Sequence, residues 1–487
     1  MRRLTGLDAS FLYLETPTTH MHVSGTYIFD PSGVQGGYRF ERVKELIVNR
    51  LHRLPPFRWR LVEVPFGLHH PIWIEDPAFD LDNHVIRRIL PPPGRKSGLL
   101  ELAGEIMGRP LNRAHPLWEI HLIEGLEGER VAMVAKTHHA AIDGASGAEL
   151  VTNLLDLSPE VTTYEDVEWE PEPIPSDTEM LAYALNSLAR QPAAFGEAVR
   201  DTFSGALRRR THSGPDASSS APAVGLFQAP RTSINRPIGA SRLFAVTEVS
   251  LADVKDIRRS LGGTVNDVVL ALCAGALRRY LLDRDELPTE PLVAMVPISV
   301  RAEEEKGSMG NRVANMFVAL ATELADPVER LNTIREHTKS SKARVTAAGT
   351  ETLATWAQFA PPLVAAQAAK LYSSTRMADH HRPAFNVTIS NVAGPQFPLY
   401  FAGARLTAWY PMGPIFDGSG LNITVMSYNN VVYFGLVACS DTVARVGDIA
   451  GFMNDAAAEL LFAAKNAPLG MKSSAQAQKA SPRRPKP

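Results

Sequence analysis

Two adjacent histidines, followed by an aspartate and a glycine, make residues 136–144 the stretch of this chain best suited to chemistry. His138 and His139 precede Asp143 and Gly144. A histidine titrates near neutral pH, so a neutral imidazole can accept the proton of an alcohol as a general base. Because side chains alternate along a strand, we expect one histidine to face a cleft and its neighbour to face the core. Asp143 would then organise the turn, and Gly144 would permit close approach of a substrate.

Paired histidines alone say little, because the chain contains two further pairs, His69-His70 and His380-His381. Neither pair is followed by an Asp-Gly at the same distance. A zinc site at the motif is disfavoured, since neighbouring side chains at a strand end diverge and no nearby cysteine or further histidine completes a tetrahedron. We expect no metal and no bound cofactor. A purely structural motif remains the alternative to a catalytic one.

The flanking sequence predicts the elements that position this motif. Residues 118–123 and 131–135 read as strands, and the turn at Gly125 to Gly128 predicts a hairpin whose second strand ends at the histidines. Apolar residues then recur at helical spacing, at Leu150, Val151, Leu154 and Leu155. The motif is therefore expected on a loop between a strand and a helix, where reactive groups are common.

Composition excludes several classes of protein. The 487 residues are 45% hydrophobic and 21% charged, with a net charge of −2, which favours a globular protein of two or more domains and gives no reason to expect a nucleic-acid partner. Two cysteines, Cys273 and Cys439, are too few for a disulfide framework and fit a reducing cytoplasm. We expect no signal peptide and no transmembrane span, since the most apolar stretches are shorter than the roughly 20 residues required. A soluble or peripheral membrane protein is predicted.

Strands and helices alternate in two halves, which predicts an α/β fold with a cleft between two lobes. We assign residues 1–156 to the first lobe, 157–240 to a connector, 241–466 to the second lobe and 467–487 to a basic, disordered tail. Within the connector, the Ser-, Ala- and Pro-rich composition predicts disorder over about residues 211–225.

The connector also contains helical signals. Ser176 and Glu179 match a capping box, and a second apolar spacing from Phe195 to Leu207 ends in three arginines. Two interpretations stay open: a helix pair that packs on the body, or an amphipathic, basic-ended membrane contact. The apolar stretch from Phe359 to Leu371 is another candidate for contact with lipid.

The His-His-x-x-x-Asp-Gly order resembles the signature of the CoA-dependent acyltransferase superfamily, which includes chloramphenicol acetyltransferase relatives and peptide-synthetase condensation domains. Further stretches resemble the bacterial wax ester synthase/diacylglycerol acyltransferase family, especially its actinobacterial members, and follow that family's order over nearly the whole chain. These stretches are Leu7–Leu12 with Met21–Val23, Pro116–Trp118, Pro230–Thr232 with Asn235 and Ile238–Gly239, Asn266–Asp267, Pro297–Arg301 with Gly310–Asn311, and Asn386–Pro395.

The resemblance implies two chloramphenicol-acetyltransferase-like lobes with a tunnel between them. It implies transfer of a long acyl chain from CoA to diacylglycerol or a fatty alcohol, with no covalent enzyme intermediate. His139 would be the general base and His138 a supporting neighbour, and Asn266 is the candidate oxyanion donor by family position. The insoluble acceptors imply a cytoplasmic protein attached peripherally to the inner membrane or to lipid droplets.

Several of these residues also have structural interpretations. Thr264 and Asp267 fit a capping box at the start of a helix over residues 265–282. Trp118 is a candidate core residue at a strand entry, and Asn386 and Asn391 are expected at turns or strand ends. Two other functions remain open: an acyltransferase that uses a carrier-protein thioester, and a non-catalytic lipid-binding relative.

Overall fold

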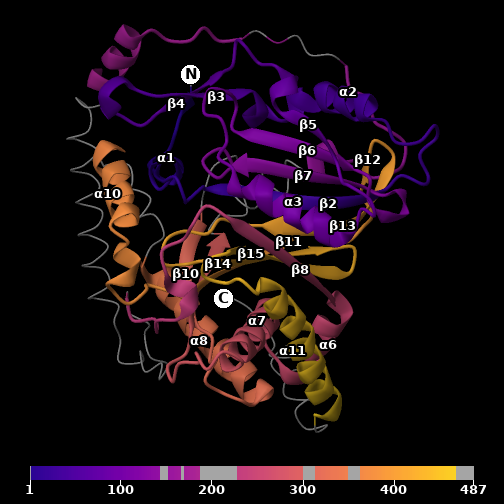
Figure 1. Ribbon diagram of the computed structural model, residues 1–487, viewed down its shortest axis with the longest axis vertical. Helices are drawn as coiled ribbons and strands as arrows, with labels where there is room; N and C mark the ends of the chain where they lie inside the picture. Colours follow the sequence, from indigo (N-terminus) through magenta and orange to yellow (C-terminus); the bar gives the residue numbers. More distant parts are fainter. Residues whose placement is uncertain are drawn as a thin grey trace, which may run out of the picture.

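The computed structural model describes residues 2–142, 152–165, 169, 171–186, 227–299, 313–348 and 362–467. Two lobes are stacked on each other, the first half of the chain forming most of one and the second half most of the other (Figure 1). Each lobe contains a six-stranded mixed sheet and its own hydrophobic core. The α/β fold with two lobes that the sequence predicts is therefore confirmed.

The first lobe is built on a sheet in the order β12-β13-β2-β7-β6-β5. Its helices α2 and α3 bury their apolar faces in the first core. A separate three-stranded sheet, β1-β4-β3, lies beside it with helix α1. The bounds are β1 Arg2–Arg3, α1 Gly6–Tyr13, β2 His22–Asp30, α2 Phe40–Arg50, β3 Trp59–Val62, β4 Ile72–Glu75, β5 Val85–Ile89, α3 Lys96–Gly108, β6 Trp118–Glu124 and β7 Val131–His138.

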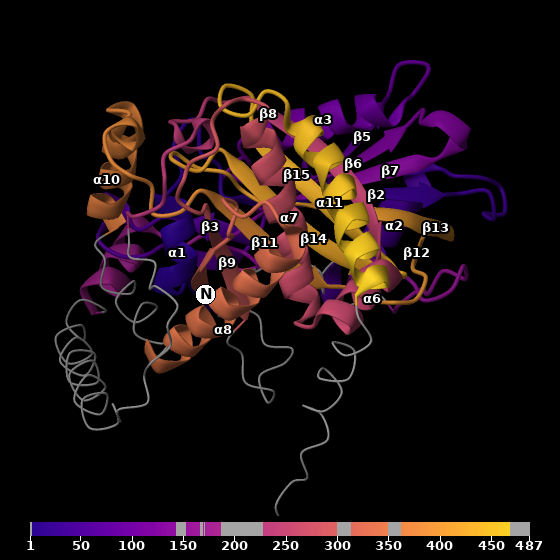
Figure 2. The same ribbon diagram turned by 90° about the horizontal axis from the view of Figure 1, so that it is seen from below.

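The second lobe is built on a sheet in the order β10-β9-β11-β14-β15-β8. Helices α6, α7, α8 and α11 form its helical layer (Figure 2), and α7 is almost entirely buried between α8 and α11. The bounds are β8 Arg242–Ser250, α6 Leu251–Leu261, α7 Val265–Leu282, β9 Val293–Ser299, β10 Val313–Ala319, α8 Pro327–Ala348, α10 Pro362–Ser374, β11 Val387–Ala393, β12 Tyr400–Phe401, β13 Ala404–Met412, β14 Leu421–Tyr428, β15 Val431–Cys439 and α11 Val446–Asn466.

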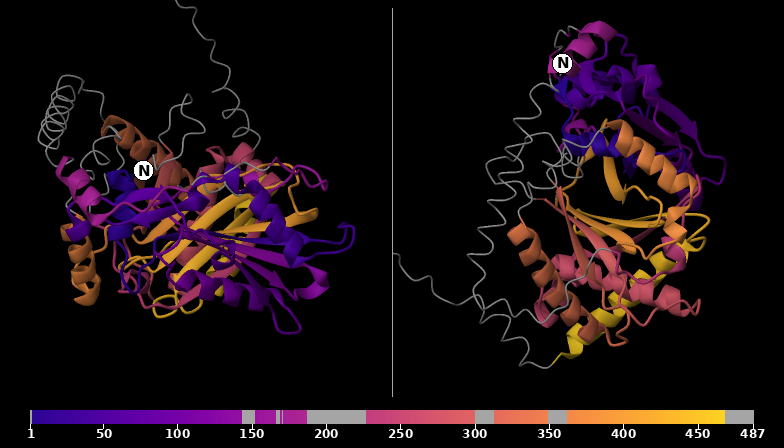
Figure 3. Two further views of the ribbon diagram at one scale, coloured as in Figure 1. Left: turned by 90° about the horizontal axis from the view of Figure 1, so that it is seen from above. Right: turned by 90° about the vertical axis from the view of Figure 1, so that its left-hand side faces the viewer.

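Strands β12 and β13 come from the second half of the chain but lie in the sheet of the first lobe (Figure 1). Strand β13 pairs with β2 along its length, from Arg405 opposite Asp30 to Met412 opposite Ser24. It also packs on β14 and β15 of the other lobe. The backbones are so close that a Cβ placed on Gly435 would lie 1.7 Å from the carbonyl oxygen of Pro411. The lobes are therefore joined by a strand as well as by the connector, and the right-hand view of Figure 3 shows one lobe above the other.

The hairpin predicted before the histidines and the two predicted helix starts are confirmed. Strands β6 and β7 pair antiparallel, and β14 and β15 are joined by Asn429-Asn430, both with positive φ. Both capping boxes form, at Thr264 with Asp267 and at Ser176 with Glu179. Among the residues described, no single helix has the length and apolar composition to cross a membrane. Helices α6 and α7 meet that criterion only jointly, across a bend of 101°.

Candidate active site

The two histidines of the motif face opposite sides of the first sheet. Strand β7 turns Ala135 and Thr137 toward a cavity between the lobes, and His139, directly after the strand, lines the same cavity. Lys136 and His138 alternate with them and are buried, each about 1% exposed. The predicted arrangement of one histidine in the cleft and one in the core is thus present.

His139 is held by its backbone and by its ring. Its N–H donates to the carbonyl oxygen of Met21 at 2.7 Å, which continues the pairing of β2 with β7 by one residue. Its imidazole stacks on Phe11 of α1, with ring centroids 4.2 Å apart and planes 14° from parallel. The strand fixes the position of His139, and the aromatic ring fixes the plane of the imidazole.

His138 holds the first turn of the loop through a hydrogen bond to its backbone. Its Nδ1 accepts the backbone N–H of Ala140 at 3.0 Å, so that the imidazole proton must be on Nε2 when the ring is neutral. That Nε2 lies 3.2 Å from a carboxylate oxygen of Glu15. His138 therefore connects the loop to an acidic residue that no local sequence pattern identifies.

Glu15 is the hub of a buried polar cluster. One carboxylate oxygen accepts the N–H of Met21 at 3.2 Å, and the other lies 2.8 Å from the guanidinium of Arg113. Burial acts to raise the pKa of Glu15, but the hydrogen bonds from His138 and from the Arg113 guanidinium outweigh it and hold the pKa well below the usual range. Glu15 is therefore a carboxylate at neutral pH.

Burial also lowers the pKa of neighbouring basic groups in this cluster. Burial, with the nearby His138 and Lys136, holds the pKa of His22 well below its usual value. Burial likewise lowers the pKa of Lys136, whose ammonium group is partly compensated by Glu119 at 3.1 Å. The ionic network thus lies on the side of β7 that carries Lys136 and His138, whereas the side that faces the cavity is largely apolar.

The cavity itself has a volume of about 840 Å³ and is lined by both lobes. Most of its lining is apolar, with contributions from α1, β2, β7, β11, β13 and α10. An elongated apolar ligand fits such a lining, and polar groups at a few positions would orient its reactive end. Apolar side chains of the lining include Phe11, Met21, Val23, Ala135, Ile142 and Leu154.

Asn391 supplies an amide to the cavity wall from the second lobe. The expectation of a turn or strand end at Asn391 is wrong, because it lies inside β11, paired opposite Val425 of β14. Its Nδ2 donates to the Oδ1 of Asn266 at 3.3 Å. Asn266 itself, the predicted oxyanion donor, is not among the lining residues, and its described contact with the cavity runs through Asn391.

Other motif residues have structural contacts. Trp118 is buried, stacks on Phe57 at 4.2 Å and donates its indole N–H to the Phe57 carbonyl oxygen. Asn386 precedes β11, as predicted, and bonds to the backbone of Val293 and to the side chain of Asn235. These residues join segments far apart in the chain. Asp143 and Gly144 lie outside the described residues, as do Arg301, Gly310 and Asn311.

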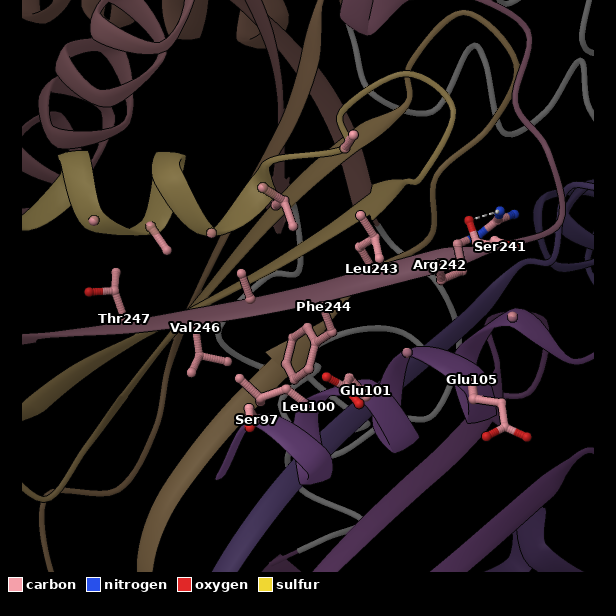
Figure 4. Close-up of a pocket in the computed structure, with 18 of the residues that line it drawn as sticks. Ser97, Leu100, Glu101, Glu105, Ser241, Arg242, Leu243, Phe244, Val246 and Thr247 are labelled. Carbon is pink, nitrogen blue, oxygen red and sulfur yellow. Dashed lines mark hydrogen bonds between the residues drawn. The ribbon is translucent and has the colours of Figure 1, made fainter. Parts of the chain in front are cut away.

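A second cavity, of about 860 Å³, lies between α3, β8 and the start of α11 (Figure 4). Phe244 and Val246 of β8 point toward Ser97 and Leu100 of α3 in this view. The predicted site residues that the structure describes do not line it. Within the described ranges, no three His, Cys, Asp or Glu side chains are arranged to hold a metal ion. The cavity at His139 is therefore the candidate active site.

Comparison with known proteins gives matches along both lobes. The family model "wax ester synthase/diacylglycerol acyltransferase catalytic domain" matches residues 4–269, and the model of the C-terminal domain of the same family matches residues 309–461. Two Mycobacterium tuberculosis proteins that bear the name putative diacylglycerol O-acyltransferase are similar to the chain. One is 36% identical over 96% of this chain and 92% of its own length, and the other is 38% identical over 91% and 92%.

Solved structures give the same result for the fold. The wax ester synthase/diacylglycerol acyltransferase from Marinobacter aquaeolei VT8 superposes with a TM-score of 0.65 at 30% identity, covering 95% of this chain and all of that one. The starter condensation domain of rhizomide synthetase, solved with C8-CoA, superposes with a TM-score of 0.54 over 97% of this chain and 96% of its own. At 12% identity, the second likeness concerns the fold alone.

Proposed function

The chain belongs to the wax ester synthase/diacylglycerol acyltransferase family, and from this premise we propose that it transfers a long acyl chain from CoA to diacylglycerol, forming triacylglycerol. Fatty alcohols would be a second class of acceptor, giving wax esters. The observation that supports this most directly is His139, placed by β7 on the wall of a largely apolar cavity between the lobes. Such a cavity suits an acyl chain, and the imidazole suits the hydroxyl group that must be deprotonated.

In the proposed reaction, His139 takes the proton of the acceptor hydroxyl as that oxygen attacks the thioester carbonyl carbon. The new C–O bond forms, and a tetrahedral intermediate with a negative oxygen results. When the C–S bond breaks, the imidazolium returns the proton to the departing CoA thiolate. The products are the ester and CoA with a free thiol, and no bond between enzyme and acyl group is required.

The supporting residues would either orient His139 or stabilise the negative charge that develops on the oxygen of the tetrahedral intermediate. His138 and the stacked Phe11 orient the loop and the ring. We expect Asp143 to organise the turn after the histidines, and Gly144 to give the substrate access. An oxyanion requires a donor, worth about 2.7–4 kcal/mol where a single one has been deleted. The amide of Asn391 is the better candidate donor, with Asn266 as the residue that positions it.

The acceptor determines where the protein must work. Diacylglycerol and long-chain alcohols are insoluble in water, so the chain would meet them at a membrane or a lipid droplet. We propose peripheral attachment on the cytoplasmic side, at the inner membrane or at lipid droplets. No metal or other cofactor is required by the proposed reaction, and acyl-CoA is a substrate.

The direct test is an acceptor comparison with one acyl-CoA. Purified protein is given palmitoyl-CoA with diacylglycerol or with hexadecanol, and both the release of CoA thiol and the neutral lipid are measured. We expect turnover with at least one acceptor, and triacylglycerol as the main product when both are present. Absence of turnover with both acceptors would remove the proposal.

Two variants separate the chemistry from the fold. His139→Ala should lose turnover while keeping its unfolding transition. The matched control is His380→Ala, because His380 is exposed and does not line the cavity. It should be as active as the unmodified protein. A fully active His139→Ala protein would contradict the general-base role.

A further inference from the structure

We propose that one apolar patch at the mouth of the cavity, formed by α1, the turn Pro65–Gly67 and α10, is the surface by which this protein docks on a phospholipid bilayer. This rests on the proposed function in so far as the acceptor is a lipid. We call this surface the rim patch. Its large apolar side chains are 40% to 81% exposed and are Leu14, Phe66, Leu68, Leu363, Val364 and Leu371.

Helix α10 contributes to the cavity and to the rim patch at the same time. Ala369 and Tyr372 line the cavity, whereas Leu363, Val364 and Leu371 are 56%, 63% and 63% exposed. At 3.6 residues per turn these two sets fall on different sides of the helix. One side of α10 is therefore a wall of the candidate substrate cavity, and the other offers apolar side chains to the outside.

Helix α1 continues the same surface. It packs against α10, and its C-cap residue Leu14 both lines the cavity and is 47% exposed. Leu14 thus lies at an opening where the apolar lining becomes apolar exterior. A lipid that leaves a bilayer at this point would move from one apolar environment to another without crossing water.

Phe66 is the most exposed of these side chains, at 81%. Its turn lies beside the start of α10, since a Cβ on Gly67 would be 3.7 Å from that of Leu363. The backbone of Phe66 has φ 59° and ψ 12°, a left-handed conformation that a bulky residue rarely adopts. A strained backbone that presents an aromatic ring to solvent is typical of a functional position, and an aromatic ring is well suited to the bilayer interface.

The position of the rim patch beside the cavity and the lysine within it favour a lipid bilayer over a protein as the binding partner. The six side chains come from three elements that adjoin one another, since both α1 and the turn at Gly67 lie against α10. Exposed Lys370 lies between Leu363 and Leu371 in the sequence of α10. A lysine at such a place can extend its ammonium group to lipid headgroups while its aliphatic part stays with the apolar residues. Shallow insertion of a few apolar side chains is a usual mode of peripheral binding.

The test measures vesicle binding without acyl-CoA, so that it does not depend on catalysis. Full-length protein is sedimented with vesicles of phosphatidylcholine and phosphatidylglycerol, and the variants are Phe66→Asn and the pair Leu363→Gln with Val364→Gln. Asn is chosen at position 66 because it tolerates the left-handed conformation. We expect each variant to bind vesicles about 10-fold more weakly, in line with the loss of one or two inserted side chains.

The matched control is Phe462→Asn, because Phe462 is 72% exposed on α11 and lies outside the rim patch. It should bind vesicles like the unmodified protein. All variants are also assayed with a short-chain acyl-CoA and a water-soluble alcohol, where their rates should be unchanged. If the unmodified protein showed no turnover with any acyl-CoA and acceptor, that would count against the proposed function. The vesicle-binding measurement would still test the docking surface.

Two results would overturn the docking surface. The first is that the unmodified protein and the rim-patch variants bind vesicles equally well, or that Phe462→Asn loses as much vesicle affinity as the rim-patch variants do. The second is a change of oligomeric state in the rim-patch variants with vesicle binding unchanged, which would make the rim patch an interface between copies of the chain.

Discussion

Nε2 of His138 lies 3.2 Å from a carboxylate oxygen of Glu15, and the same oxygen accepts the backbone N–H of Met21. Met21 in turn accepts the N–H of His139 through its carbonyl oxygen at 2.7 Å. One partly buried carboxylate is thus connected to both histidines of the motif, to His138 through its ring and to His139 through the backbone of Met21. We propose that Glu15 is a positioning residue, because it contacts His138 and Met21 and does not line the cavity.

We therefore predict that Glu15→Gln lowers kcat by about 10-fold to 100-fold and leaves KM for acyl-CoA little changed. The amide can donate where the carboxylate only accepts, so at least one contact is lost, at a cost of about 1–3 kcal/mol of unfolding free energy. Steady-state kinetics and urea unfolding measure the two effects. The matched control is Glu63→Gln, since exposed Glu63 pairs with the other arm of Arg113 at 3.2 Å. Full activity and stability in Glu15→Gln would contradict this role.

His138 and His139 are predicted to fail in different ways. His139→Ala should reduce turnover by about 10²–10⁴-fold, the usual contribution of a general base, with little change in stability. His138→Ala should lower the free energy of unfolding by about 1–3 kcal/mol, because the Glu15 carboxylate and the N–H of Ala140 each lose a hydrogen-bond partner. Comparison of kcat with the urea midpoint separates them. An unstable His139→Ala, or a stable and inactive His138→Ala, would reverse the assignment.

Phe11 is predicted to matter through the plane of the imidazole. Phe11→Ala removes the ring that stacks on His139 and should lower kcat by about 10-fold, since stacked aromatic pairs contribute about 0.5–1.5 kcal/mol. Phe11→Tyr keeps the stack and should restore most of the rate. Leu7→Ala is the control for a general change of the lining, because Leu7 belongs to the same helix and lines the same cavity. Equal losses in Leu7→Ala and Phe11→Ala would show that only volume matters.

Elements with local signals could be predicted from the sequence. The capping box of Thr264 and Asp267 fixes the start of α7, and Asn429-Asn430 adopt the positive φ values that a tight hairpin needs. Alternation along β7 was enough to predict that the two histidines face opposite sides. In each case the determining contacts lie within a few residues of one another.

Elements that depend on distant partners could not be predicted in this way. Nothing in Ala404–Met412 specifies pairing with β2, because Arg405 and Asp30 are joined only in the folded sheet. Glu15 follows helix α1, and no periodic pattern in the sequence singles it out. Its proposed role depends on contacts with Arg113 and His138, both remote in the chain. Asn391 reads as a turn residue by type, yet its pairing with Val425 of β14 keeps it within β11, a central strand of the sheet. The family-like stretches Leu7–Leu12 and Met21–Val23 lie on either side of Glu15 but do not include it.

The junction of the lobes gives a prediction about packing. Gly435→Ala places a methyl group 1.7 Å from the carbonyl oxygen of Pro411, so β13 and β15 must separate. We expect a loss of about 1–3 kcal/mol in the free energy of unfolding, as is typical of overpacking. Gly451→Ala is the control, since its new methyl group meets nothing within 4 Å and should stabilise α11 by about 0.4–1 kcal/mol. Equal stability of the two variants would mean that the strands can part at no cost.

The buried histidines predict how stability depends on pH. Burial holds the pKa of His22 well below its usual value and also lowers the pKa of His20, His84 and His121. Below about pH 6.5 the unfolded chain binds protons at these positions and the folded chain does not, so stability rises with pH and is lost as the pH falls. Each such group contributes at most about 1.4 kcal/mol per pH unit.

Urea midpoints should therefore decrease from about pH 7.5 to about pH 5.5. The decrease should be smaller in His22→Gln, whereas His380→Gln, at an exposed position, should follow the unmodified protein. Glu15 adds a separate effect at lower pH. Its folded pKa is depressed, so its contribution is complete above the unfolded value of about 4.5 and is lost as the pH falls further. A midpoint that stays constant down to about pH 5.5, or a His22→Gln slope equal to that of the unmodified protein, would show that His22 takes up its proton in the folded state.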